Sequence, residues 1–143
     1  MKVRIKSSDW EIVKYETVWA VAFDFRCIED LVFKPGEFKL VETGLVVEVP
    51  EWYYLQISPR SSTFKKHWLI QTNSVWIVDR DYCWNNDTIK FPYFNLSWEK
   101  QVIDKWTRIG QWVFLKYVKA EFELVDDMSH NNDRWGFGST WIK

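Results

Sequence analysis

NSVWIVDRDYCWNND, residues 73–87, is the stretch of the sequence that says most about the fold. Short apolar runs stand on either side of a polar turn that contains Asp79 and Tyr82. This pattern predicts a hairpin that presents a carboxylate and an aromatic ring to a ligand, although exposed aspartates are also ordinary in turns. Trp76 and Trp84 stand at the two shoulders of the turn, where a small residue such as glycine is expected.

The segments around this hairpin predict an all-β protein. We expect strands over residues 40–49 (interrupted at Thr43-Gly44), 53–57, 69–71, 75–78, 88–91, 113–118 and 121–125. The composition of residues 34–37 (KPGE) is that of a turn. Only residues 61–67 (SSTFKKH) look helical, with serine side chains that cap the helix start. Many short strands separated by frequent turns are typical of a sandwich, a barrel or a jelly roll.

The length of 143 residues predicts one β domain, over residues 1–125, followed by a C-terminal arm over residues 126–143. The arm is polar and contains glycine and serine, so we expect it to be mobile. It nevertheless carries an arginine, a phenylalanine and the run GFGST, which are residue types that contact ligands. The alternatives for this segment are a phosphate-binding arm and a disordered terminus.

Composition excludes several classes of protein. The net charge is −1 and charged residues make up 27% of the chain, so no overall basic field indicates a nucleic-acid or membrane-surface partner. No apolar run approaches the roughly 20 residues of a membrane span, and residues 1–9 lack the apolar core of a signal peptide. Cys27 and Cys83 form neither a disulfide framework nor a metal site, and His67 and His130 are isolated. We therefore expect a cytoplasmic protein.

Two further stretches contain candidate binding residues. Asp24 lies in the apolar run AVAFDFRC and needs a partner there, either a cation, a metal-bound water or a capping amide. Arg60, Ser61 and Ser62 open the predicted helix, where free amides and added donors favour an anion. A purely structural helix cap explains the same residues.

In chain order, AVAFDF, PRSSTF, NSVWIVDRDYCWNND, RIGQ and RWGFGSTW resemble the five motifs of the trimeric dUTPases. The resemblance extends from about Tyr15 to the end of the chain and includes the flanking FPYFN. It implies a jelly-roll (β-clip) subunit with one short helix after the PRSS motif and a mobile C-terminal tail. It also implies a homotrimer with active sites at the subunit interfaces, which removes dUTP from DNA precursors by Mg²⁺-assisted hydrolysis to dUMP and pyrophosphate.

The resemblance implies a role for individual residues. Asp79 would be the general base for the attacking water, Gln111 would help position that water, and Asp24 would hold waters of the Mg²⁺ ion. Substrate binding would fall to residues of the second, third and fifth motifs: Arg60, Ser61, Ser62, Asn73, Tyr82, Arg134, Phe137, Ser139 and Thr140. Tyr82 would stack under the deoxyribose, Asn73 would read uracil, and Phe137 would cover the base.

The main departure from the family is the number of tryptophans, 11 against only 5 glycines, where glycine usually makes up about 7% of a chain. Nine stand where the family has glycine: Trp19, Trp52, Trp68, Trp76, Trp84, Trp106, Trp112, Trp135 and Trp141. Trp10 and Trp98 lie in variable loops. Our hypothesis is a decoding artefact, in which UGA codons that the source reads as glycine were translated as tryptophan. The alternative is a mutated or naturally tryptophan-bearing chain, which we expect to fold poorly or to be inactive.

Three other functions remain open. The related dCTP deaminases share the fold and the PRSS segment, but their third motif is less similar to VDRDYC. A dUTPase-like protein that binds nucleotide or a protein partner without turnover is the second alternative. The third is a tryptophan-rich protein that binds carbohydrate or a single-stranded nucleic acid, although its tryptophans would be expected on strand faces rather than in turns.

Overall fold

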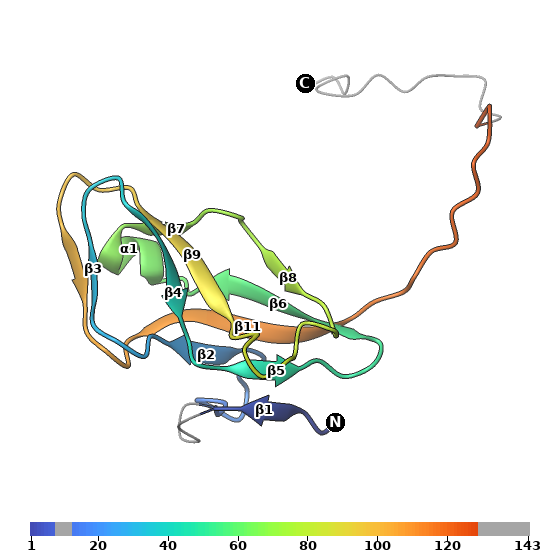
Figure 1. Cartoon of the computed structure of the whole chain (residues 1–143), viewed down its shortest axis with the longest axis horizontal. Helices are drawn as coiled ribbons and strands as arrows, with labels where there is room; N and C mark the ends of the chain where they lie inside the picture. Colours follow the sequence, from blue (N-terminus) through green and yellow to red (C-terminus); the bar gives the residue numbers. More distant parts are fainter. Residues whose placement is uncertain (8–12, 129–143) are drawn as a thin grey trace.

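The computed structural model describes residues 1–7 and 13–128, and their regular secondary structure is almost entirely β-strand (Figure 1). The strands are β1 (Arg4–Lys6), β2 (Phe23–Arg26), β3 (Leu31–Phe33), β4 (Phe38–Glu42), β5 (Val46–Glu48), β6 (Tyr53–Pro59), β7 (Leu69–Gln71), β8 (Trp76–Val78), β9 (Lys90–Asn95), β10 (Gln101–Ile103) and β11 (Arg108–Lys116). The one helix of the described part is α1 (Thr63–His67), directly after β6. The prediction of an all-β fold with one short helix is confirmed.

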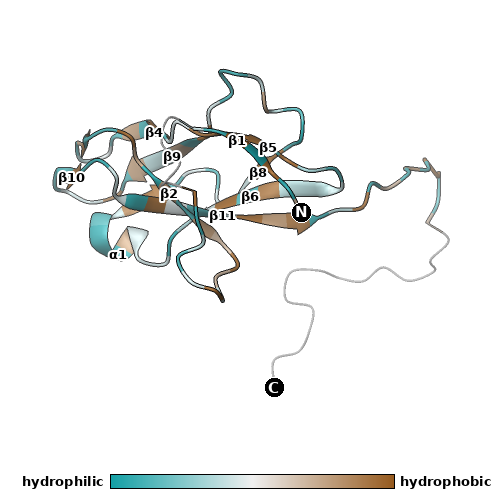
Figure 2. Ribbon diagram, turned by 90° about the horizontal axis from the view of Figure 1, so that it is seen from below, coloured by the Kyte–Doolittle hydropathy of each residue, from teal (hydrophilic) through white to brown (hydrophobic). Residues whose placement is uncertain are grey.

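All strand pairs are antiparallel, and the strands form two main sheets. One sheet has the order β2-β11-β6-β8 and the other has the order β4-β9-β7, while β1-β5 and β10-β3 form separate pairs. The second half of β11 carries mainly hydrophobic residues (Figure 2). The strand order places β11 between β2 and β6, so residues far apart in the chain meet on the first sheet.

Aromatic side chains join the two sheets in the core. The Phe25 ring on β2 lies 5.1 Å from the Phe91 ring on β9 in an edge-on arrangement, and Phe91 stacks on Tyr93 at 5.4 Å. A Cβ atom at Gly110 would lie 1.9 Å from Phe91 Cζ, so only glycine allows β11 to approach β9 this closely. Tyr93 donates a hydrogen bond to the Ile109 carbonyl at 2.6 Å. Burial raises the pKa of the Tyr93 hydroxyl and keeps it a donor.

The start of α1 is fixed by a threonine rather than by the predicted serine cap. Ser62 occupies the N-cap position but makes no side-chain capping bond within the described structure. Thr63 is buried; its hydroxyl donates to the Ile109 carbonyl at 2.9 Å and accepts the Arg60 amide at 3.2 Å. The sequence prediction was wrong because Thr63, one residue later, points at the bulged part of β11 and satisfies both groups.

Most strand predictions are confirmed. The interruption of residues 40–49 at Thr43-Gly44 separates β4 from β5, and residues 69–71 are β7. The turn at residues 34–37 is closed by a hydrogen bond from the Glu37 amide to the Lys34 carbonyl at 3.1 Å. No strand was predicted at β1, β3 or β10, each of which is three residues long.

The predicted strand over residues 121–125 is wrong. The described chain after β11 has no strand and extends away from the sheets (Figure 1). Phe122 and Leu124 are 93% and 99% exposed. The alternating pattern alone is therefore not enough to form a strand, because the segment packs against no sheet of the described residues. The division at residue 125 stays a prediction, since residues 129–143 lie outside the described part.

Two exclusions made from composition can be compared with the structure. Cys27 and Cys83 are both free cysteines in the described chain, as predicted. Among the described residues, no helix is long and apolar enough to cross a membrane.

Candidate functional site

Strand register brings three sequence motifs together on one sheet. On β11, Gln111 pairs with Asp24 of β2 on one side and with Ser58 of β6 on the other. Directly paired residues on neighbouring strands project to the same face of a sheet. Arg60 directly follows β6, so it lies next to the paired residues Asp24, Gln111 and Ser58.

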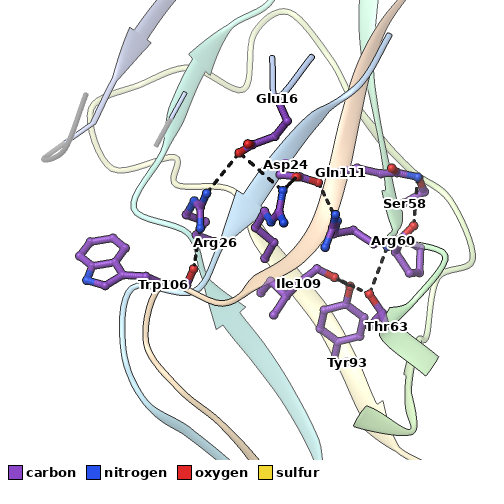
Figure 3. Close-up of polar contacts among 12 residues, drawn as sticks. Glu16, Asp24, Arg26, Ser58, Arg60, Thr63, Tyr93, Trp106, Ile109 and Gln111 are labelled. Carbon is purple, nitrogen blue, oxygen red and sulfur yellow. Dashed lines mark hydrogen bonds and ion pairs between the residues drawn. The ribbon is translucent and has the colours of Figure 1, made fainter. Parts of the chain in front are cut away.

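Asp24 receives two arginine side chains (Figure 3). Its Oδ1 atom lies 2.7 Å from Arg60 Nε, and its Oδ2 atom lies 3.0 Å from Arg108 Nη1. The Asp24 side chain is only 13% exposed, which strengthens these contacts relative to a surface pair. Of the partners predicted for Asp24, the structure shows the cation, and it supplies two.

A second carboxylate extends this group. Glu16 Oε1 lies 3.2 Å from Arg26 Nη2 and 3.7 Å from Arg108 Nη1, while Arg26 also donates to the Trp106 carbonyl at 3.0 Å. Arg26 and Arg108 are paired across β2 and β11, so Glu16 offsets their mutual repulsion.

We call the five charged side chains of this region the arginine cluster: Glu16, Asp24, Arg26, Arg60 and Arg108. Three positive charges against two negative ones leave an excess that favours an anion. Glu16, Arg26 and Arg108 were not predicted as site residues. Arg26 had a usable signal, because it lies two residues from Asp24 and therefore on the same face of β2.

Gln111 is held against the end of β6. Its Nε2 atom donates to the Pro59 carbonyl at 3.2 Å and contacts Ser58 Oγ at 3.5 Å. Ser61 is exposed, whereas Ser62 is half-buried at the start of α1. The structure therefore gathers Asp24, Arg60 and Gln111, as well as the two serines next to Arg60.

The hairpin of residues 73–87 forms a second group. Asp79 follows β8 and is exposed, and its carbonyl accepts the Tyr82 amide at 3.3 Å. The Tyr82 hydroxyl donates to the Thr88 carbonyl at 3.1 Å, and the Trp76 ring lies 6.4 Å from the Tyr82 ring. Asn73 is exposed in the turn between β7 and β8.

The two groups lie apart within one subunit. On β6, Leu55 pairs with Val78, the residue before Asp79, whereas Ser58 lies beside Gln111. Leu55 and Ser58 are three residues apart, or about 10 Å along the strand, and Asp79 continues in the direction away from Ser58. The pairing therefore separates the hairpin carboxylate from the arginine cluster.

The remaining predicted site residues cannot be placed. Arg134, Phe137, Ser139 and Thr140 lie outside the described residues. In the part of the chain that the structure covers, no group of three or more His, Cys, Asp or Glu side chains could hold a metal ion. Asp24 is consequently the one carboxylate of the predicted metal site that the structure places, and it is already paired with arginines.

Comparison with known proteins gives one family for nearly the whole chain. The sequence model of the dUTPase family matches residues 8–141. The chain is 42% identical over 120 residues to the SPbeta prophage-derived deoxyuridine 5'-triphosphate nucleotidohydrolase YosS of Bacillus subtilis, covering 84% of this chain and 83% of that one. It is 40% identical over 143 residues to the deoxyuridine 5'-triphosphate nucleotidohydrolase of Nautilia profundicola, covering 98% and 99%.

Solved structures share the fold. The dUTPase of Streptococcus mutans superposes with a TM-score of 0.77 at 26% identity, over 85% of this chain and 100% of that one. The dUTPase of Staphylococcus bacteriophage 80alpha with dUPNHPP superposes with a TM-score of 0.83 at 18% identity, over 99% of each chain. The jelly-roll prediction is therefore confirmed. With the family match across nearly its whole length, the chain belongs to the dUTPase family.

Proposed function

We propose that this protein hydrolyses dUTP to dUMP and pyrophosphate at sites shared between the copies of a homotrimer. The observation that carries the proposal is the meeting of Asp24, Arg60 and Gln111 on one sheet. They come from three separate motifs of the family pattern. Hydrolysis of a triphosphate requires charge neutralisation, an oriented water and a base, with little covalent participation by the protein.

The arginine cluster would bind the phosphate chain. Arg60 presents its guanidinium at the end of β6, with the exposed Ser61 next to it and Ser62 at the start of α1. An arriving phosphate competes with Asp24 for Arg60, because a guanidinium forms strong bonds with either anion. Arg108 keeps Asp24 partly neutralised when Arg60 turns to the substrate.

The cofactor would be Mg²⁺ that arrives with the triphosphate. Magnesium keeps several waters and binds through one or two carboxylates plus substrate phosphates, which fits a single carboxylate such as Asp24 rather than a protein cage. When bound, the ion neutralises charge on the phosphate oxygens. Asp24 would hold waters of that ion, and its two arginine contacts fix the carboxylate in place.

The catalytic water would be activated by Asp79 and positioned by Gln111. Since one subunit separates Asp79 from the arginine cluster, a complete site takes its hairpin from a second copy. The exposed segment after β11 supports assembly: Val118, Phe122 and Leu124 are 93–99% exposed, more apolar surface than a solvated extension needs.

The hairpin would select the nucleotide. Tyr82 offers a ring for the deoxyribose, while Asn73 and the backbone around it would read uracil, because a rigid hairpin leaves no room for a 5-methyl group. The ring of Trp76 lies 6.4 Å from that of Tyr82, close enough to crowd a nucleotide placed on the Tyr82 ring. The arm would complete the site, with Arg134, Ser139 and Thr140 on the phosphates and Phe137 over the base. We place the activity in the cytoplasm.

Pyrophosphate release from dUTP with Mg²⁺ tests the proposal in the chain that carries Trp76→Gly and Trp84→Gly. We expect hydrolysis to exceed that of the unsubstituted chain by about a hundredfold, the cost of misplacing a reacting group by about 1 Å. Equal activity of the two chains would contradict the steric argument for these tryptophans. No pyrophosphate from either chain, with nucleotide still bound, would indicate a binding protein.

Two parallel measurements separate the alternatives. Ammonia released from dCTP would identify a deaminase, whereas the proposal predicts none. Sedimentation of the protein should give the mass of three subunits, and a monomer that hydrolyses dUTP would overturn the shared site.

A further inference from the structure

The turn at residues 34–37 defines a backbone geometry that needs glycine. Gly36 occupies its third position with φ +68°, and the Glu37 amide bonds to the Lys34 carbonyl at 3.1 Å. A turn with positive φ at its third residue favours glycine because a Cβ atom is strained there. A Cβ at Gly36 would meet no described atom within 4 Å, so the backbone angle, rather than lack of space, demands glycine.

The same turn occurs twice more, with tryptophan in the place of glycine. In residues 50–53 the Tyr53 amide bonds to the Pro50 carbonyl at 3.2 Å, and Trp52 at the third position has φ +66°. In residues 104–107 the closing bond is 3.1 Å, and Trp106 at the third position has φ +69°. The three turns thus have the same type of closing hydrogen bond and nearly the same φ at the third position. They differ in the residue at that position, which is glycine in one turn and tryptophan in the other two.

A fourth site is the end of α1. Trp68 has φ +53° and ψ +25°, and its amide bonds to the Phe64 carbonyl at 2.8 Å. A left-handed residue that closes the last turn of a helix in this way is usually glycine, for the same steric reason.

Tryptophan dominates the strained positions. Among the described residues, the non-glycine residues with positive φ are Trp52, Trp68, Ser74 and Trp106. Positive φ is uncommon outside glycine and is enriched in Asn, Asp and His, whereas a bulky residue there is an outlier. Chance placement of tryptophan does not explain three such residues out of four.

The indole rings of these three residues bury little surface that could offset the backbone strain. The side chains of Trp52, Trp68 and Trp106 are 58%, 49% and 38% exposed. Trp52 lies 6.4 Å from the Tyr117 ring, and Trp106 lies under the ammonium group of Lys105. These contacts are made by partly exposed rings that are not part of the described core, so no core packing requirement selects a large ring there.

We propose that the native protein carries glycine at positions 52, 68 and 106, encoded by UGA codons that its source reads as glycine. The backbone angles establish the requirement without reference to the catalysed reaction, so the proposal holds whatever substrate the protein uses. Trp112 is not included in this proposal, because it is not among the described residues with positive φ. It lies on β11, is 1% exposed, and packs against Phe23 and Phe25 at 5.2 and 4.9 Å.

Mass spectrometry of the protein purified from its natural source tests the proposal directly. Peptides that cover the three positions should contain glycine, and the intact mass should fall below the 17.4 kDa of the chain as written. Tryptophan in any of the three peptides would overturn the proposal, as would a UGG codon at any of these positions in the source gene. Neither result depends on whether the tryptophan-bearing chain folds.

Paired variants of recombinant protein test the backbone requirement. Trp52→Gly and Trp52→Ala remove the same ring, so their difference reports the angle alone. We expect the glycine variant to have a folding equilibrium constant about 5-fold or more above that of the alanine variant, measured by urea unfolding. The same order should hold at positions 68 and 106. Alanine equal to or above glycine at these sites would overturn the requirement.

Trp98 supplies the matched control. It is 95% exposed and is not among the described residues with positive φ. Glycine should therefore be less stable than alanine there, because glycine loses more backbone freedom on folding. The reciprocal change, Gly36→Ala, should lower the folding equilibrium constant by about the factor that separates glycine from alanine at position 52, because a Cβ at Gly36 meets no described atom within 4 Å.

Discussion

The arginine cluster and the 73–87 hairpin are constructed in different ways. The cluster is fixed by strand pairing and by ion pairs to Asp24, whose side chain is 13% exposed. The hairpin presents Asp79 and Tyr82 at the surface, and the hydrogen bonds described for them stay within residues 79–88. One subunit thus supports the proposed phosphate-binding residues from within, whereas the proposed base-binding hairpin is held mainly by its own contacts. Substitutions in the two regions should therefore separate stability from catalysis.

The largest effect is expected from Asp79→Asn in the chain with glycine at positions 76 and 84. Asp79 is the proposed general base, so its loss should reduce dUTP hydrolysis by about 10²- to 10⁴-fold. Asp79 is exposed, so the free energy of unfolding should change by no more than about 0.5 kcal/mol. Pyrophosphate release and urea unfolding measure the two quantities.

Asp81→Asn is the control for this change, since Asp81 is exposed in the same turn. It should leave both quantities unaltered. A comparable loss of activity in both variants would mean that the turn's charge, rather than a specific base, matters.

The second prediction concerns the opposite region. Asp24→Asn removes the negative charge that two guanidiniums share, and leaves Arg60 and Arg108 facing each other without it. We expect the free energy of unfolding to fall by about 1–3 kcal/mol, because the charges are partly buried. Activity should fall as well, and urea unfolding together with a magnesium titration of pyrophosphate release would measure both effects.

Glu48→Gln is a matched control, because Glu48 pairs with a single, largely exposed Arg4. Its effect on unfolding should be well below that of Asp24→Asn. If Asp24→Asn changed activity alone, the cluster would not contribute to the fold and the contrast with the hairpin would disappear.

The third prediction tests how α1 holds the cluster. Thr63→Val keeps the shape of the side chain but removes the hydroxyl that joins the Arg60 amide to the Ile109 carbonyl. We expect a loss of about 1–2 kcal/mol, since Thr63 is buried and both groups lose a partner. Thr63→Ser keeps the hydroxyl and should recover most of the loss in urea unfolding. Equal losses in both variants would attribute the effect to packing of the methyl group.

The hairpin shows how far the sequence alone could reach. Apolar runs around Asp79 predicted a strand on each side, and the structure has β8 and β9 there. The partner that Asp24 required was also foreseeable, because a carboxylate in an apolar strand is costly without one. Its identity as Arg108 was not, since a bulge between residues 108 and 110 brings that side chain to Asp24. Periodicity carries no signal for such a bulge.

Other failures have physical reasons of the same kind. A serine at a helix start is usually a cap, but at Ser62 the neighbouring buried Thr63 supplied the bond. The alternation over residues 121–125 is typical of a strand, but this segment pairs with no strand of residues 1–7 and 13–128. In contrast, the tryptophans in turns were visible in the sequence, and the angles of three of them give that pattern a steric meaning. Local chemistry was predictable, whereas pairing across the chain was not.

The smallest expected effect is a pH dependence at His67, the last residue of α1. Burial lowers the pKa of His67, and the charge of Lys66 lowers it further. The folded protein therefore binds a proton less readily than the unfolded chain, whose histidine titrates near about 6.5. As pH falls below this value the unfolded state takes up more protons, and the free energy of unfolding decreases. Above it, the contribution is fully present.

His67→Gln removes the titrating group and should flatten the decrease in unfolding free energy between about pH 7 and pH 5, a range above the ordinary pKa of carboxylates. Lys66→Ala should raise the pKa of His67 in the folded protein toward its ordinary value, since only burial then lowers it. The decrease in unfolding free energy at low pH should therefore be smaller. Because α1 anchors the loop of Arg60, acid should weaken the arginine cluster before the hairpin, which is seen as earlier hydrogen exchange at the Arg60 amide. Identical pH curves for the wild-type and His67→Gln chains would show that the helix end does not contribute to this difference between the two regions.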